Sequence, residues 1–145
     1  MSTSVLICDD SKLARRQLAR SLPDDWDIQI EYAIDGLDCI KQIKLTQPEI
    51  LFLDLNMPEM DGYEVLIAIK EMSLKVLTVV VSGDIQPNAY QRVLELGAID
   101  FIQKPCSADK IAEIIDSHGI KDKAIRERLA HSFGQEIDSD IRDIL

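Results

Sequence analysis

Nearly continuous apolar runs alternate along this chain with segments whose apolar residues recur every three or four positions. Three runs are almost wholly apolar, at residues 4–9, 49–54 and 75–82, which is the pattern of parallel strands covered on both faces. Two other runs, at 27–33 and 99–103, mix apolar with polar residues, as strands with one wetter side do. The pattern therefore predicts three central strands and two edge strands.

Helical spacing of apolar residues fills each gap between these runs. Ser11 and Ser107 are suited to cap the first and fifth helices, and Pro87 suits the first turn of the fourth. The second and third helices are expected over residues 36–46 and 61–72. The expected core-facing stripes are Leu13, Leu18 and Leu22; Leu37, Ile40 and Ile43; Val65, Leu66 and Ile69; Tyr90, Val93 and Leu94; and Ile111, Ile114 and Ile115.

Five strand–helix units in series predict an α/β fold with a doubly wound, five-stranded parallel sheet. With the second and fifth strands at the edges, the strand order is 2-1-3-4-5, a flavodoxin-like arrangement. Residues 1–118 are expected to form this unit. Residues 119–145 are expected to be a helical extension, a linker or the start of a truncated output domain.

Composition narrows the function classes. The 145 residues carry a formal net charge of −10, which argues against direct nucleic-acid binding, because that requires clustered Lys and Arg. Cys8, Cys39 and Cys106 have no C-x-x-C spacing, so reduced thiols are expected. No apolar run reaches the length of a membrane span, and the first residues lack the features of a signal peptide. A cytoplasmic location is therefore expected.

Polar side chains follow four of the predicted strands, at the sheet edge where doubly wound folds bind ligands. Asp9 and Asp10 follow the first strand, Asp54 the third, Ser82 the fourth and Lys104 the fifth. Three carboxylates disfavour one another's ionisation unless a cation lies between them, and Mg²⁺ prefers such oxygen ligands. A carboxylate beside this metal can act as a nucleophile toward phosphorus. The pattern therefore predicts phosphoryl transfer onto the third carboxylate.

The same residues resemble the receiver domain of the bacterial response-regulator family, the CheY-like proteins of two-component signal transduction. The match covers about residues 4–118 and rests on the adjacent acids, the "LFLDLNMPEMDG" segment, the switch serine and the "KP" dipeptide. The resemblance implies that Asp54 accepts phosphate from a histidine kinase or phosphotransfer protein. It also implies that Asp9, Asp10, Asp54 and the backbone carbonyl of Asn56 hold Mg²⁺, for which Mn²⁺ can substitute.

The resemblance further implies how the signal leaves the site. Lys104 would pair with the phosphoryl group, Ser82 would move toward it, and Phe101 would turn inward. The Lys104–Pro105 bond would be cis. The face made by the fourth helix, fifth strand and fifth helix would then change toward an output partner, an output domain or a second copy. Gly83 stands where Ala is usual in the family.

Some of the same residues also fit other interpretations. One of the adjacent acids can cap the first helix, and Phe101 can simply pack on the fifth helix. A Mg²⁺-dependent phosphohydrolase would need a second acid where Asn56 stands, and a substrate-covering cap that this chain is too short to hold. A phosphate-independent interaction module would normally have lost an acid or Lys104. A signalling domain that is not an enzyme on other substrates is therefore expected.

The tail carries two apolar stripes at helical spacing: Ile125, Leu129 and Phe133, then Ile137, Ile141, Ile144 and Leu145. The first stripe is expected to fold back on its own domain. The alternatives are a helix that pairs with a partner or a second copy, and the beginning of an output domain. The last six residues, "DIRDIL", resemble the opening helix of chemotaxis phosphatase domains of the CheC kind.

Overall fold

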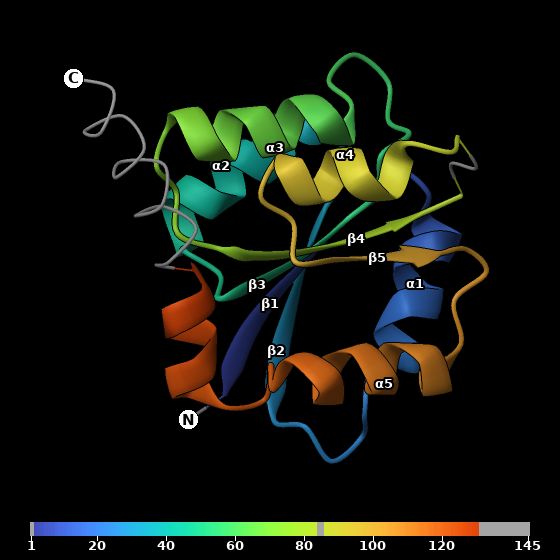
Figure 1. Ribbon diagram of the computed structural model, residues 1–145, viewed down its shortest axis with the longest axis vertical. Coiled ribbons are helices and arrows are strands. Elements are labelled where there is room, and N and C mark those ends of the chain that lie inside the picture. Colours follow the sequence, from blue (N-terminus) through green and yellow to red (C-terminus); the bar gives the residue numbers. More distant parts are fainter. Residues whose placement is uncertain (1, 84–85, 131–145) are drawn as a thin grey trace.

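A parallel sheet lies between two layers of helices in the computed structural model, which describes residues 2–83 and 86–130 (Figure 1). The strands are β1 (Thr3–Cys8), β2 (Ile28–Ala33), β3 (Ile50–Leu53), β4 (Leu77–Ser82) and β5 (Asp100–Gln103). The helices are α1 (Lys12–Ser21), α2 (Gly36–Thr46), α3 (Gly62–Glu71), α4 (Ala89–Glu95) and α5 (Ala108–His118). The sheet order is β2-β1-β3-β4-β5, which confirms the predicted fold.

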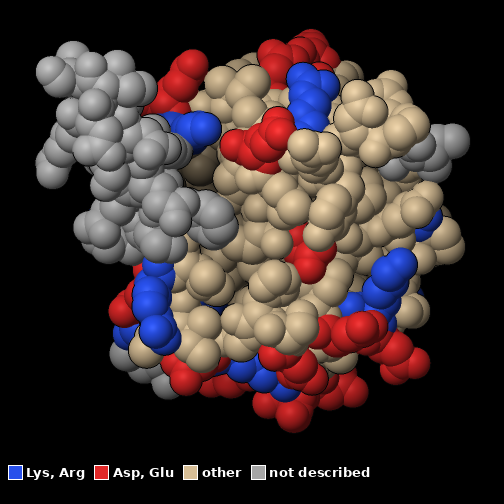
Figure 2. Space-filling model, in the orientation of Figure 1, with Lys and Arg blue, Asp and Glu red and all other residues tan. Residues whose placement is uncertain are grey.

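Two helical layers cover the two faces of the sheet, and charged side chains are spread unevenly over the face seen in Figure 2. Helices α1 and α5 cover one face of the sheet, and α2, α3 and α4 cover the other (Figure 1). In the same orientation, charged side chains gather around α5 and the lower margin of the molecule (Figure 2). The area between α4 and α5, over β5, is mainly uncharged (Figure 2). Among the described helices, none has the length and apolar character needed to cross a membrane.

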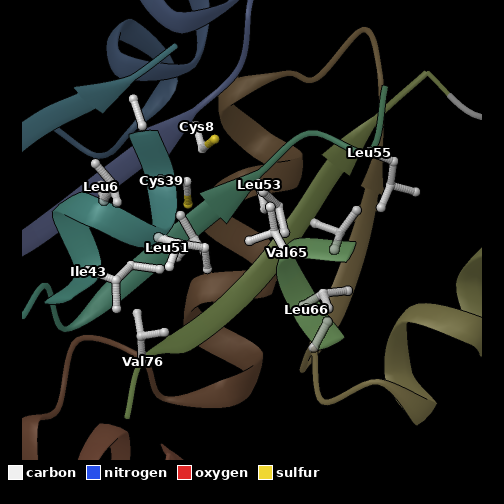
Figure 3. Close-up of a cluster of buried hydrophobic side chains, with 14 of the residues drawn as sticks. Leu6, Cys8, Cys39, Ile43, Leu51, Leu53, Leu55, Val65, Leu66 and Val76 are labelled. Carbon is white, nitrogen blue, oxygen red and sulfur yellow. The ribbon is translucent and has the colours of Figure 1, made fainter. Parts of the chain in front are cut away.

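Side-chain alternation in the buried strands divides the core into two clusters. In β1, Leu6 and Cys8 join the cluster beneath α2, α3 and α4 (Figure 3), whereas Val5 and Ile7 join the cluster beneath α1 and α5. All four residues are at most 1% exposed. Successive residues of a strand point to opposite faces, so a strand covered on both faces must be apolar throughout. This explains the continuous runs in the sequence.

The helix starts follow the predicted caps, with one exception. The Ser11 and Ser107 hydroxyls accept hydrogen bonds from the backbone N–H of the third residue of α1 and α5, Ala14 and Lys110. Pro87, expected in the first turn of the fourth helix, instead lies two residues before α4. The Ala89 N–H donates to the Gln86 carbonyl at 3.1 Å, so proline occupies the second position of a β-turn, which its fixed φ also favours.

Three residues expected to face the core are instead exposed. Leu13, Leu37 and Tyr90 are 66%, 63% and 53% exposed, and each is the second residue of its helix. These first turns follow the loops at the carboxyl edge of the sheet, where the helix begins beyond the end of the strands. The rest of each stripe is buried or packs against the core, except Leu94, which is half-buried and belongs to neither core cluster.

The described part of the C-terminal extension, residues 119–130, packs on the domain at the amino ends of the strands, away from Asp54. Residues 123–130 are helical, and Leu129 contacts the cluster beneath α1 and α5. Arg126, which is 5% exposed, donates from Nη2 to Glu49 Oε1 at 3.0 Å and from Nη1 to the Ile120 carbonyl at 2.9 Å. Phe133 and the second apolar stripe lie outside the described residues.

The Glu49–Arg126 ion pair also connects the tail to the first strand. Glu49 Oε2 accepts a hydrogen bond from the Ser4 backbone N–H at 2.9 Å. Partial burial alone would raise the pKa of Glu49, but the bonds from Ser4 and Arg126 outweigh it and lower the pKa below its ordinary value. The carboxylate is therefore held in its charged form between β1 and the tail helix.

The close approach of α3 to the end of β3 generates a stability prediction. A Cβ atom on Gly62 would lie 2.4 Å from the Asp54 carbonyl oxygen and 2.7 Å from the Leu55 Cα, and neither backbone atom can easily move. We expect Gly62→Ala to lower the free energy of unfolding by about 2 kcal/mol, measured by urea denaturation. Gly83→Ala is the matched control, because a Cβ there meets nothing within 4 Å. Equal stability of the two variants would contradict the prediction.

Candidate functional site

Three carboxylates from two neighbouring strands meet at the carboxyl edge of the sheet. Asp9 and Asp10 directly follow β1, and Asp54 directly follows β3, which pairs with β1. One oxygen of each carboxylate lies within 4.8 Å of the others. Asp9 and Asp54 are buried and Asp10 is exposed. The site thus presents several hard oxygen atoms at one solvent-accessible point, which suits a divalent cation such as Mg²⁺.

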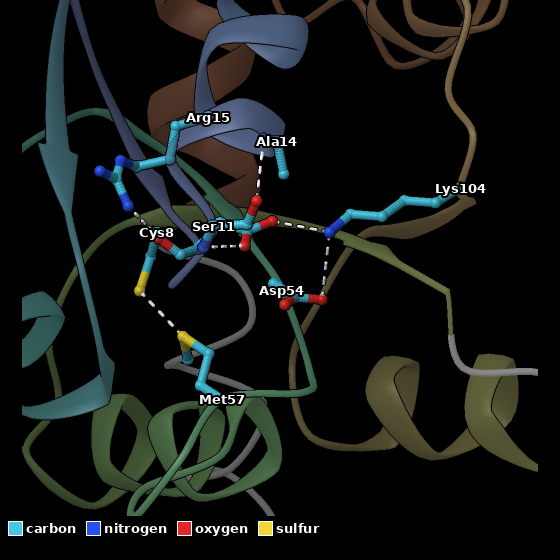
Figure 4. A network of polar contacts seen from close by, with 8 residues as sticks. Cys8, Ser11, Ala14, Arg15, Asp54, Met57 and Lys104 are labelled. Atoms are coloured by element: carbon cyan, nitrogen blue, oxygen red, sulfur yellow. Dashed lines mark hydrogen bonds and ion pairs between the residues drawn. The ribbon is translucent and has the colours of Figure 1, made fainter.

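Lys104 reaches these acids from the loop after β5 (Figure 4). Its Nζ lies 2.6 Å from Asp9 Oδ2 and 3.6 Å from Asp54 Oδ1. Burial alone would lower the pKa of Lys104, but the hydrogen bond to Asp9 and the charges of both acids raise it above its ordinary value. The ammonium therefore stays charged, and one positive charge faces two buried carboxylates.

Burial, together with the excess of negative charge over positive charge at this site, raises the pKa of the Asp54 carboxyl. Desolvation is the largest cause that raises the pKa of its carboxyl, and the neighbouring Asp9 charge adds to it. The Lys104 charge and the hydrogen bonds from the Asn56 backbone and the Ser82 side chain act in the opposite direction without cancelling the rise. Ionised Asp54 is therefore a high-energy carboxylate, which additional positive charge or a covalent bond at its oxygen would stabilise.

Asp9 is held in place by the start of α1. Its Oδ1 accepts a hydrogen bond from the Ser11 N–H at 2.9 Å, and its backbone carbonyl accepts one from Arg15 Nη1 at 2.8 Å (Figure 4). Sequence analysis did not identify Arg15 as a site residue. The available signal was its position six residues after Asp9, in the first helix, from which a long side chain can reach back to the preceding strand end.

The structure places the other predicted site residues around Asp54. Ser82 is fully buried at the end of β4. Asn56 is exposed, two residues after Asp54. Lys104 N–H donates to the Ser82 carbonyl at 2.9 Å, which brings the ends of β4 and β5 together, and the Lys104–Pro105 peptide bond is cis.

Phe101 lies one step farther from the acids, in β5. It is opposite Val80 of β4, is partly buried, and packs against the cluster beneath α2, α3 and α4. The interpretation that it packs on α5 is therefore wrong, because α5 covers the other face of the sheet. On this side of the sheet the Phe101 side chain contacts the core cluster and is partly exposed to solvent.

A small pocket adjoins the acids. It has a volume of about 280 Å³, and its lining includes Asp9, Asp54 and Lys104 together with the apolar Leu18 and Phe52. The polar side chains lie at the carboxyl edge, where the three acids meet.

Comparison with known proteins gives consistent matches. A family model, the response regulator receiver domain, matches residues 5–116. The chemotaxis protein CheY of Listeria monocytogenes is 36% identical over 115 residues, which are 77% of this chain and 94% of that protein. A chain of the CheX–CheY–BeF₃–Mg²⁺ complex from Borrelia burgdorferi superimposes with a TM-score of 0.73 at 28% identity. It covers 79% of this chain and 88% of that chain.

Longer relatives match only in part. A protein-glutamate methylesterase/protein-glutamine glutaminase of Geobacter sulfurreducens is 37% identical over 102 residues, which are 70% of this chain and 27% of that protein. A protein of the same name from Clostridium acetobutylicum is 34% identical over 88% of this chain and 36% of its own length. This chain therefore spans about a quarter to a third of the length of these relatives.

The raised pKa of Asp54 generates a prediction about stability and pH. A carboxyl whose pKa is raised by folding stabilises the fold below its unfolded value, near 3.8, and loses that contribution as pH rises through the folded value. We expect Asp54→Asn to be more stable than the wild type at pH 7 in chelator, with the difference shrinking toward pH 4. Thermal unfolding followed by circular dichroism measures this.

Asp24→Asn provides the control for this experiment, because Asp24 is exposed and distant from the cluster. Its unfolding temperature should follow that of the wild type across the same pH range. An Asp54→Asn protein no more stable than the wild type at neutral pH, without divalent cations, would contradict the electrostatic cost assigned to Asp54.

Proposed function

Because the chain belongs to the response regulator receiver domain family of two-component signalling proteins, we propose that it is a switch controlled by phosphorylation of Asp54. The observation that carries the proposal is the pairing of Asp54 and Asp9 with a single charged Lys104 at the carboxyl edge of the sheet. A buried carboxylate with a raised pKa and a partial counter-charge is poised to bond to an electrophile. The protein would modify itself rather than turn over other substrates.

The donor set fits Mg²⁺. The proposed ligands are the Asp10 and Asp54 carboxylates, Asp9 mainly through water, and the Asn56 backbone carbonyl, with Mn²⁺ as a substitute. Two observations support the fit: the oxygens of the three acids lie within 4.8 Å of one another, and, within residues 2–83 and 86–130, Lys104 supplies the one ammonium that contacts them. When bound, the ion would supply positive charge that stabilises the phosphoryl oxygens during transfer.

Asp54 is the proposed nucleophile toward a phosphohistidine of a histidine kinase or phosphotransfer protein. One carboxylate oxygen forms a bond to phosphorus as the phosphorus–nitrogen bond breaks, and the histidine nitrogen leaves with the electron pair. Lys104 Nζ, 3.6 Å from Asp54 Oδ1, is placed to bind a phosphoryl oxygen. The Ser82 hydroxyl, which already hydrogen-bonds Asp54, can transfer its bond to the new group.

The proposed output is a change on the α4-β5-α5 face. Ser82 and Phe101 lie on the paired strands β4 and β5, two residues apart in register. Movement of Ser82 toward the phosphoryl group would vacate space into which Phe101 can turn. The surface over β5, between α4 and α5, is mainly uncharged (Figure 2), which suits docking. The partner that binds this face would be an output protein, an attached output domain or a second copy of the chain.

Phosphorylation is tested first by intact-mass spectrometry after incubation with acetyl phosphate. We expect one phosphoryl adduct on the wild type that requires Mg²⁺ and is absent from Asp54→Asn. Asp9 is equally buried and also contacts Lys104, but its two carboxylate oxygens already accept hydrogen bonds from the Ser11 N–H and from Lys104. The Asp24→Asn control should still be labelled. No adduct on the wild type, with beryllofluoride also failing to bind, would overturn the phosphoacceptor proposal.

Metal binding is tested separately, by isothermal titration of Mg²⁺ into the unphosphorylated protein. Loss of one ligating oxygen in Asp10→Asn is expected to weaken Mg²⁺ binding by at least about tenfold. Because Asp10 is exposed, we expect this variant to fold as the wild type does, and circular dichroism checks this. Unchanged affinity relative to the wild type and Asp24→Asn would remove Asp10 from the proposed ligand set.

A further inference from the structure

A large groove lies at the amino end of the sheet, opposite Asp54. Its volume is about 1030 Å³, and it is bounded by the helical residues 123–130 and by the carboxyl ends of α2 and α3. Its apolar lining includes Ile43, Pro48 and Leu74. A groove of this size and character can take an amphipathic helix along its length, and none of the roles proposed above uses it.

The groove is basic although the chain as a whole is acidic. Its described lining includes Lys44, Lys75, Arg126 and Arg128, against only two carboxylates, Glu49 and Glu127. The formal net charge of the whole chain is −10. Basic side chains around an apolar floor favour an occupant with acidic side chains beside an apolar stripe.

Arg126 adds a specific donor to this lining. Its Nη atoms are engaged by Glu49 and by backbone carbonyls, but Nε is buried and has no hydrogen-bond partner among the described residues. A buried donor without a partner costs free energy. An acidic side chain that enters the groove beside Arg126 could remove that cost.

The chain itself contains a segment with the complementary character. Residues 135–145, "QEIDSDIRDIL", carry four acids and one arginine. Their apolar residues follow helical spacing: Ile137, Ile141, Ile144 and Leu145. Ala130, the last described residue, lines the groove, so only four residues separate the groove edge from the start of this segment. Such a short connection gives the segment a high effective concentration at the groove.

We propose that residues 135–145 bind in this groove as an amphipathic helix, with the isoleucine stripe on Ile43 and Leu74 and the acids beside Lys44, Lys75 and Arg128. The docked segment lies at the end of the sheet away from Asp54. It therefore leaves both the phosphorylation site and the α4-β5-α5 face free, and phosphorylation and tail docking can occur in the same molecule.

Pulsed hydrogen exchange on the full chain, read by mass spectrometry, tests the proposal. The amides of residues 135–145 should exchange at least about tenfold more slowly than an unstructured peptide. The Lys75→Glu/Arg128→Glu double variant, which reverses two exposed charges, should lose most of that protection. Lys41→Glu/Lys110→Glu is the matched control, because both lysines are exposed and neither lines the groove. It should keep the protection.

Carbodiimide cross-linking locates the segment independently. We expect an amide link between Lys44 or Lys75 and a carboxylate of residues 136–143 at protein concentrations low enough to exclude association. Absence of protection in the wild type would overturn the proposal. So would protection that the groove variant retains, or protection and cross-links that vanish on dilution, which would assign the groove to a second copy.

Discussion

The structure depends on one unbalanced electrostatic arrangement: two buried carboxylates, Asp9 and Asp54, share a single ammonium from Lys104. The acids are buried because the paired strands β1 and β3 end side by side. The lysine reaches them because β5, two strands from β3 and three from β1, ends at the same edge. The remaining cost appears as the raised pKa of Asp54. A site in this condition gains stability from any added positive charge or from modification of the carboxylate, which is the physical basis of the proposed switch.

The rest of the fold serves to hold that arrangement. A doubly wound parallel sheet brings all strand ends with polar residues to one edge, while the apolar strands below fix their spacing. Gly62 lets α3 pack directly against the Asp54–Leu55 backbone, and the Arg15 side chain fixes the Asp9 carbonyl. The opposite edge has a different character. There the Glu49–Arg126 pair attaches the tail helix beside a basic groove, so the two ends of one sheet can serve two separate binding events.

Much of this could be predicted from local sequence pattern. The uniformly apolar runs and the helical stripes predicted the strand order, and the polar residues after each run predicted the contents of the site. The predictions failed where a residue's environment depends on where a neighbouring element stops. Leu13, Leu37 and Tyr90 continue apolar stripes yet are exposed in the first turns of their helices. Phe101 faces the α4 layer and not α5, a choice that alternation in a short edge strand does not specify.

The sequence by itself therefore determined the α/β fold, the parallel sheet and the group of three aspartates, one serine and one lysine at its carboxyl edge. It could do so because strand and helix periodicities are local and because parallel strands place their carboxyl ends together. Only the tertiary structure decided that Lys104 bridges Asp9 and Asp54, that Arg15 supports the site, and that Arg126 is buried against Glu49. These contacts join residues from different elements, and their distances depend on how the packed helices and loops direct long side chains.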